Sequence, residues 1–441
     1  MGLDYLLPLH QYSKSLVGRM RITDRLRSLA SQRFVKSVGL LAGGTVIGNA
    51  ILVLVLPILT RLYGPDAFGM LGVYMSLLDV LAVAACLRLD LATPLPTADE
   101  DGMSLLALGV ISATGFSLLL AATVYLMPTQ IVSLLRQPGF EPFLWMLPAG
   151  VWLLAIYSAI QFWTIRKQRF ALVAETQVVR AIGGGGSQIG FGVLGVSPFG
   201  LLMGHMIQSG LGSFSMARSL WRHDKNLIAT ITPTTLWKNL KEQRRFPLYS
   251  VPESLLDTAA NGLPLVLIAA ISGPIEAGYL LLAQRVSSVP SSLLGSSISK
   301  VYLAEARPKM DEGQLGVFTR KIVKTLFKAG IGPFILLAVS APLLFPVIFG
   351  AEWERAGAMV TWMTPFMILQ FMASPVSTIL HATENQRIAF ILQLTGFVLL
   401  IGSIVMAGRL IPEWTFEAFA VAAAAYNAIF LAVVWRVSLN H

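Results

Sequence analysis

Long apolar runs dominate the pattern of hydrophobic and polar positions along the chain. A helix needs about 20 residues to cross the roughly 30 Å hydrocarbon core of a bilayer. The runs are continuous rather than alternating, which favours helices over the strands of a membrane barrel. Twelve spans are predicted, at 37–60, 67–88, 103–127, 143–165, 171–193, 198–220, 247–271, 275–298, 325–349, 357–380, 388–408 and 414–435.

Composition leads to the same fold class, an all-α integral membrane protein. Charged residues make up only 13% of the 441-residue chain, whereas a water-facing domain carries about 25%. The lone cysteine, Cys86, and five scattered histidines provide neither a disulfide framework nor a metal site. No phosphate-binding loop motif is present, so no nucleotide and no other cofactor is expected.

The basic residues predict the orientation in the membrane. With the N-terminus in the cytoplasm, 27 of the 33 lysines and arginines fall on the cytoplasmic side, as the positive-inside rule requires. The net charge of +10 is therefore interpreted as basic cytoplasmic loops, not as nucleic-acid binding. Residues 1–36 read either as a basic amphipathic helix on the cytoplasmic lipid surface or as a disordered tail.

The spans divide into two halves. The hydrophilic stretch 221–246 is predicted to be a basic cytoplasmic linker between six-helix bundles at 37–220 and 247–441. Each half carries the same signature between its first two helices, Gly64-Pro65-x-x-x-Gly69 and Gly273-Pro274-x-x-x-Gly278. Because a six-helix repeat keeps corresponding helices parallel, the halves are expected to be related by an axis along the membrane normal.

Several motifs resemble a known family. They are the stretches 56–69 and 87–92 in the first half and 246–250, 273–274 and 284–290 in the second. They are similar to the polysaccharide transporter family of O-antigen and lipopolysaccharide flippases, within the multidrug/oligosaccharidyl-lipid/polysaccharide flippase superfamily. One departure is Leu89, which stands between Arg88 and Asp90 where many members carry an aromatic residue.

The resemblance implies a V-shaped, MATE-like pair of bundles in the bacterial cytoplasmic (inner) membrane. It implies a transporter and not an enzyme. Its substrate would be an oligosaccharide, such as an O-antigen or exopolysaccharide repeat unit, linked through pyrophosphate to a polyprenyl lipid. Membrane lipids and a polysaccharide polymerase complex are further candidate partners.

Two arginines lie near the middle of predicted spans, where a charge is costly unless it faces a wet cavity or a partner. They are Arg180 and Arg285, with Gln177 and Ser288 one turn away on the same faces. Guanidinium groups pair well with phosphate oxygens, so these four residues are candidates for binding the pyrophosphate. The alternative is a structural ion pair with Glu175, Asp257 or Asp79.

A second set of candidates is acidic. Glu253 and Asp257 share a helix face, and Asp79 and Glu175 lie within other spans. They are candidates for coupling transport to H+ or Na+, with pairing to the arginines as the alternative. The candidate gate or boundary residues at span ends are Arg61, Arg88 and Asp90.

The same residues bear on three alternatives: a cation antiporter, a membrane enzyme and a different lipid-linked cargo. A multidrug cation antiporter of the same superfamily would need unpaired carboxylates and few intramembrane arginines. A polymerase or glycosyltransferase would need a catalytic constellation at a membrane face, and the short outer loops and dispersed carboxylates offer none. A lipid-linked peptidoglycan precursor is an alternative cargo.

Overall fold

A computed structural model describes residues 39–40, 43–288, 313–376 and 386–439, and the predicted N-terminal segment 1–36 lies outside them. These residues form helices and no strand, which confirms the all-α prediction. Nine of the helices within these ranges are long and apolar enough to cross a membrane. They match nine predicted spans, all except 171–193, 198–220 and 275–298.

The three remaining spans differ for identifiable reasons. The first is α7 (Phe170–Val193), a full-length helix made less apolar by Glu175, Arg180 and its glycines. The second breaks into α8 (Phe199–Gly210) and α9 (Ser213–Ile228), because Gly212 takes a positive φ of 91°. The third is helical over 274–288, and the rest of it lies outside the described residues.

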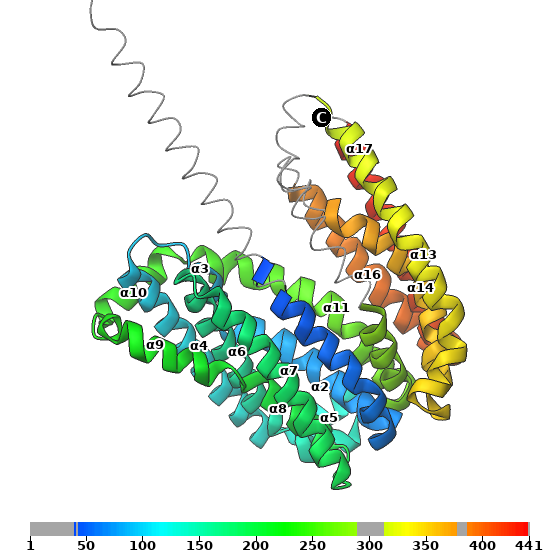
Figure 1. Cartoon of the computed structure of the whole chain (residues 1–441), viewed down its shortest axis with the longest axis horizontal. Coiled ribbons are helices and arrows are strands. Elements are labelled where there is room, and N and C mark those ends of the chain that lie inside the picture. The colour runs from blue at the N-terminus through cyan, green and yellow to red at the C-terminus, as the bar shows by residue number, and fades with distance from the viewer. Residues whose placement is uncertain (1–38, 41–42, 289–312, 377–385, 440–441) are drawn as a thin grey trace, which may run out of the picture.

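The N-terminal helices pack into one group (Figure 1). The first helix, Gly43–Leu62, lies against α7, where glycines on both helices allow close approach. The group further contains α2 (Pro65–Ala85), α3 (Leu89–Ala92), α4 (Asp99–Leu126), α5 (Pro128–Leu135), α6 (Met146–Arg166) and α8, with a 3-10 turn at Pro138–Phe143.

The C-terminal helices form a second group. They are α13 (Leu315–Phe349), α14 (Glu354–Val376), α16 (Gln386–Leu410) and α17 (Thr415–Leu439), with 3-10 turns at Ala351–Trp353 and Pro412–Trp414. Helix α13 begins ten residues before its predicted span at 325–349. This extension carries the charged residues Arg320, Lys321 and Lys324. The apolar part of the helix that follows them is still long enough to span the membrane.

The predicted linker 221–246 is itself largely helical. It contains the end of α9 and all of α10 (Pro233–Glu242), and it is followed by a π-helical turn at Phe246–Ser250 and α11 (Val251–Ser272). Helices α9 and α10 pack against α6 and α4, so this segment is attached to the N-terminal group.

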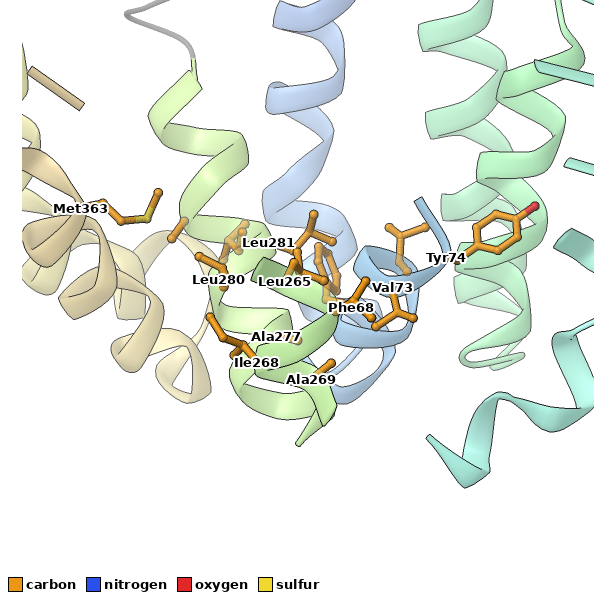
Figure 2. Packing of buried hydrophobic residues seen from close by; sticks show 14 of the residues in the cluster. Phe68, Val73, Tyr74, Leu265, Ile268, Ala269, Ala277, Leu280, Leu281 and Met363 are labelled. Atoms are coloured by element: carbon orange, nitrogen blue, oxygen red, sulfur yellow. The ribbon is translucent and has the colours of Figure 1, made fainter. Parts of the chain in front are cut away.

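The two groups diverge toward the side that holds the C-terminus and meet on the opposite side, giving a V (Figure 1). Helix α11 contacts α2 in one group and α16 in the other. Figure 2 shows the core at this junction, with Leu265 of α11 and Leu281 of helix 274–288 near Phe68 of α2, and with Ile268 and Leu280 on the side toward Met363 of α14. At the meeting side, the Trp353 indole donates to the Thr60 carbonyl oxygen at 3.2 Å.

Candidate functional site

A pocket of about 230 Å³ lies within the N-terminal group, between the end of α2 and helices α6 and α7. Four residues singled out from the sequence line it, namely Asp79, Arg88, Asp90 and Arg180. Helix α6 contributes polar groups to the same wall, from Tyr157, Ser158 and Gln161. The fold thus brings together charged residues that lie as much as 101 positions apart, from 79 to 180.

The turn between α2 and α3 orients the side chains of Arg88 and Asp90. Leu87 and Arg88 both adopt positive φ, at 50° and 55°, a conformation that costs non-glycine residues about 1 kcal/mol or more each. The turn directs Arg88 toward α11, where its Nε donates to the Ser254 hydroxyl at 2.9 Å. Arg88 therefore connects the pocket to the helix that leads into the second half of the chain.

Asp90 is held in one orientation at the start of α3. The Ser158 hydroxyl donates to its Oδ2 at 2.7 Å, and the residue is only 4% exposed. Its Oδ1 is buried and has no hydrogen-bond partner among the described residues. Since an unpaired buried carboxylate oxygen is costly, Oδ1 is an acceptor available to a hydrogen-bond donor or a small cation in the pocket.

Arg180 projects from α7, and among the described residues only its Nε has a hydrogen-bond acceptor. Its guanidinium lies 4.0 Å from the centroid of the Tyr157 ring, a favourable cation–π geometry. Its Nε donates to the carbonyl oxygen of Gln208 at 2.9 Å. The two terminal nitrogens have no ion-pair partner within the described ranges. This arrangement fixes the group and leaves its outer edge free to bind an anion.

Arg285 is half-buried on helix 274–288 and does not line this pocket. Its Nη2 lies 3.0 Å from the Met75 sulfur, a weak acceptor. It too lacks an ion pair among the residues that the structure describes. The alternative of structural ion pairs from Arg180 or Arg285 to Glu175, Asp257 or Asp79 is therefore not seen in this structure.

His205 on α8 is a site residue that sequence reasoning missed. It lies within electrostatic range of both Arg180 and Arg285, and its ring meets Tyr74 edge-on at 6.0 Å. Its Nδ1 is buried without a partner in the described part of the chain. A lone histidine in an apolar helix gives no sequence signal, because only the packing of α8 on α2 and α7 places it there.

The remaining candidates lie elsewhere. Asp257 accepts from Gln393 Nε2 of α16 at 3.2 Å. Glu253 is exposed on α11, and Glu175 is exposed on α7. Ser288 is exposed, and its hydroxyl donates to the Arg285 carbonyl oxygen at 2.8 Å.

Gln177 and Arg61, the last two candidates, lie in different parts of the molecule. Gln177 is half-buried one turn before Arg180 and does not line the pocket. Arg61 lies at the opposite end of the molecule from Arg88, where its Nη2 donates to the Val347 carbonyl oxygen of α13 at 3.4 Å. The three candidate gate residues therefore occupy both ends of the junction between the two groups.

Comparison with known proteins bears on both fold and family. A family model described as polysaccharide biosynthesis protein matches residues 58–358. No curated protein matches the sequence. Among solved structures, the lipid II flippase MurJ in an inward closed conformation aligns with a TM-score of 0.70 at 14% identity, covering 91% of this chain and 87% of that one.

Two further solved structures are multidrug resistance MATE family transporters of the MOP superfamily. The inward-facing one has a TM-score of 0.55 at 13% identity, with 91% and 94% of the two chains covered. The outward-facing one has a TM-score of 0.50 at 14% identity, with the same coverage. These likenesses confirm the V-shaped fold, and the family model confirms the resemblance found in the motifs. The chain belongs to the polysaccharide biosynthesis protein family and has the fold of the flippases and multidrug transporters of the MOP superfamily.

Proposed function

We propose that this protein is a flippase that moves a polyprenyl-pyrophosphate-linked oligosaccharide from the cytoplasmic to the outer leaflet of the bacterial inner membrane. The observation that carries the proposal is a pair of arginines within the helix groups, Arg180 and Arg285, that have no carboxylate partner among the described residues. Charges at such depth are retained for a ligand or a wet cavity. A flippase for a pyrophosphate-linked lipid supplies both.

The chemistry of the arginines fits a diphosphate. Guanidinium presents planar paired donors to phosphate oxygens and keeps its charge. Arg180 is fixed by Tyr157 and the Gln208 carbonyl oxygen, so its unused donors are already oriented. Arg285, which like Arg180 lies within electrostatic range of His205, would supply the second guanidinium, with Ser288 and Gln177 as further polar contacts.

Transport would proceed by rocking of two halves, 37–220 and 247–441, around this site. The divergence of the helix groups toward the C-terminal side supports an inward-open state, with both termini in the cytoplasm (Figure 1). The basic residues support the same orientation. An inside-negative potential favours export of an anionic headgroup by about 2.3 kcal/mol per charge per 100 mV. A polysaccharide polymerase on the outer side would use the exported unit.

Ion coupling is part of the proposal at two places. Asp79 is exposed within the pocket that contains Arg180, and it forms no ion pair with any described residue. Asp257, next to exposed Glu253, links α11 to α16 through Gln393. A carboxylate that binds H+ or Na+ in one state and releases it in the other would couple the ion gradient to rocking. Glu175 is an exposed carboxylate on α7, and like Asp257 and Glu253 it lies outside the pocket.

A multidrug cation exporter is the second candidate, because Asp79 and Asp90 line the pocket and Asp90 has an unpaired oxygen. Arg88 and Arg180 line the same pocket, however, and two guanidinium groups repel a cationic drug. The solved structures of this fold named above are transporters, which supports transport over polymerase or glycosyltransferase chemistry.

The test is deletion of the gene followed by extraction of lipid carriers and labelling of their sugars on each side of the membrane. We expect a pyrophosphate-linked oligosaccharide to accumulate on the cytoplasmic side and to fall again on complementation. Unchanged carrier pools and sidedness, with loss of resistance to cationic compounds, would favour the exporter instead.

A further inference from the structure

Helices α9 and α10 expose large aromatic side chains that no described part of the chain covers. Phe214, Trp221 and Trp237 are 79%, 66% and 70% exposed. Trp221 and Trp237 lie in the hydrophilic stretch 221–246 and not in a predicted span. An exposed indole in a polar segment calls for a surface that is part apolar and part wet.

Basic residues share the exposed faces with these aromatics. Phe214, Arg218, Trp221 and Lys225 follow one another at spacings of four, three and four residues, so they form one stripe along α9. On α10, Lys241 lies one turn after Trp237. Further exposed basic side chains flank these stripes, namely Arg222, Arg244 and Arg245. We call these nine residues, together with Leu248, the α9–α10 surface.

The opposite faces of both helices are fixed to the N-terminal group by buried polar contacts. Asp224, the single acid of α9, is turned inward and bound by Arg169 through two hydrogen bonds of 2.8 and 3.0 Å. The Trp163 indole donates to the same carboxylate at 3.0 Å. Asn239 of α10 is buried and donates to Asp101 Oδ1 at 2.9 Å.

This anchoring has two consequences for the exposed side. The α9–α10 surface is positive, because six of its residues are basic and the carboxylate of Asp224 is withdrawn, which leaves Glu242 as the exposed acid of the two helices. The aromatic side chains cannot turn inward either, because Asp224, Asn239 and their partners already occupy the inner faces.

We infer that the α9–α10 surface binds the headgroup region of anionic phospholipids on the bilayer surface. A surface facing hydrocarbon would exclude the lysines and arginines, and one facing water would not expose Trp221, Trp237 and Phe214 together. The headgroup region accommodates both kinds of side chain, since indoles prefer it and basic groups pair with lipid phosphates. The surface follows directly on α8, which lies within the helix group that spans the membrane.

Such an interaction would hold the N-terminal group at a fixed depth and tilt. The π-helical turn Phe246–Ser250 that follows α10 begins the connection to α11 and the second group. Anionic lipid at this surface would therefore act on the half of the transporter that carries the pocket, independently of which substrate it transports.

The test uses the full-length protein in phosphatidylcholine nanodiscs that contain brominated phosphatidylglycerol or, at the same mole fraction, brominated phosphatidylcholine. The contribution of Trp237 to fluorescence quenching is the difference between the native protein and Trp237→Phe. We expect the anionic lipid to quench Trp237 about twofold more strongly, and high salt to remove the preference.

Charge-neutral variants provide the matched comparison. Lys241→Gln combined with Arg244→Gln and Arg245→Gln should lose the preference, whereas Arg387→Gln, an exposed basic residue on α16, should keep it. Equal quenching of native Trp237 by the two lipids, or quenching by neither, would overturn the inference. Because the readout needs no transport, it stands apart from the test of the flippase proposal.

Discussion

Gly69 of α2 and Gly278 of helix 274–288 lie against each other's helix starts in a reciprocal contact. A Cβ atom at Gly69 would overlap the carbonyl oxygen of Pro274, and one at Gly278 would overlap that of Pro65. The two Gly-Pro-x-x-x-Gly signatures therefore pack directly on each other across the two halves. A repeat that is visible in the sequence becomes a symmetric crossing of helices with backbone in contact.

This crossing predicts a strong requirement for glycine. Gly278→Ala would place a methyl group into backbone that cannot move aside without separating α2 from its neighbour. We expect a loss of about 1–3 kcal/mol in stability, as overpacking usually costs, measured as a lower thermal unfolding midpoint of the purified protein in detergent. Gly69→Ala should behave in the same way.

The control for this prediction is Gly115→Ala on α4, where an added Cβ meets no atom within 4 Å. Alanine there should leave the midpoint unchanged or raise it slightly, since alanine is the better helix former by about 1 kcal/mol. Equal midpoints for Gly278→Ala and Gly115→Ala would show that the close crossing is absent from the protein in solution.

The two intramembrane arginines give a prediction about transport. Arg180→Ala and Arg285→Ala should each lower transport of the lipid-linked oligosaccharide about tenfold or more, because each removes charge-assisted hydrogen bonds to phosphate worth about 1.5–3 kcal/mol. The measurement is appearance of the sugar on the lumenal side of inverted vesicles or on the outside of right-side-out vesicles. Lysine should restore part of the activity, as it keeps the charge and loses the paired donors.

Abundance in the membrane distinguishes binding from folding for these variants. Arg409→Ala, which changes an exposed basic residue at the end of α16, serves as control and should transport normally. Loss of the Arg180→Ala and Arg285→Ala proteins from the membrane, in place of loss of transport, would assign both side chains a structural role.

Much of this fold was predictable because hydrophobic runs fix where helices cross a bilayer. The break between α8 and α9 was not, since hydropathy continues through Leu211 and only the positive φ of Gly212 ends the helix. The segment 221–246 was predicted as a linker from its charges. The sequence does not show that one of these charges differs from the rest: Asp224 forms a buried ion pair with Arg169, and this pair exists only because α9 packs on α6.

The site was predictable by residue type and not by geometry. Asp79, Arg88, Asp90 and Arg180 were each singled out as charges in or near spans, yet their meeting in one pocket depends on how α2, α6 and α7 rotate about their axes. Helical spacing shows which residues share a face of one helix. It does not show which neighbouring helix that face contacts. For the same reason His205 had no signal.

Asp79 gives a prediction about ion coupling. If its carboxylate in the pocket binds H+ or Na+ during the cycle, Asp79→Asn should retain substrate binding and lose the response of transport to an imposed ion gradient. The measurement is transport in proteoliposomes with and without pH and sodium gradients. Glu413→Gln is the matched control, because Glu413 is an exposed carboxylate in the turn Pro412–Trp414, outside the pocket. Transport by the native protein that ignores both gradients would remove the coupling role altogether.

Asp224 gives a prediction about stability near α9. Asp224→Asn breaks a buried ion pair with Arg169 and leaves that guanidinium without its carboxylate. Loss of one partner of a buried pair typically costs about 3–5 kcal/mol, and Arg169 is partly exposed, so we expect about half of that. Limited proteolysis should cut between α9 and α10 faster in Asp224→Asn than in the native protein.

The control is Asp66→Asn in the first turn of α2, on the far side of the same helix group. Equal cleavage rates at the α9–α10 connection in both variants would mean that the ion pair does not hold α9 in place.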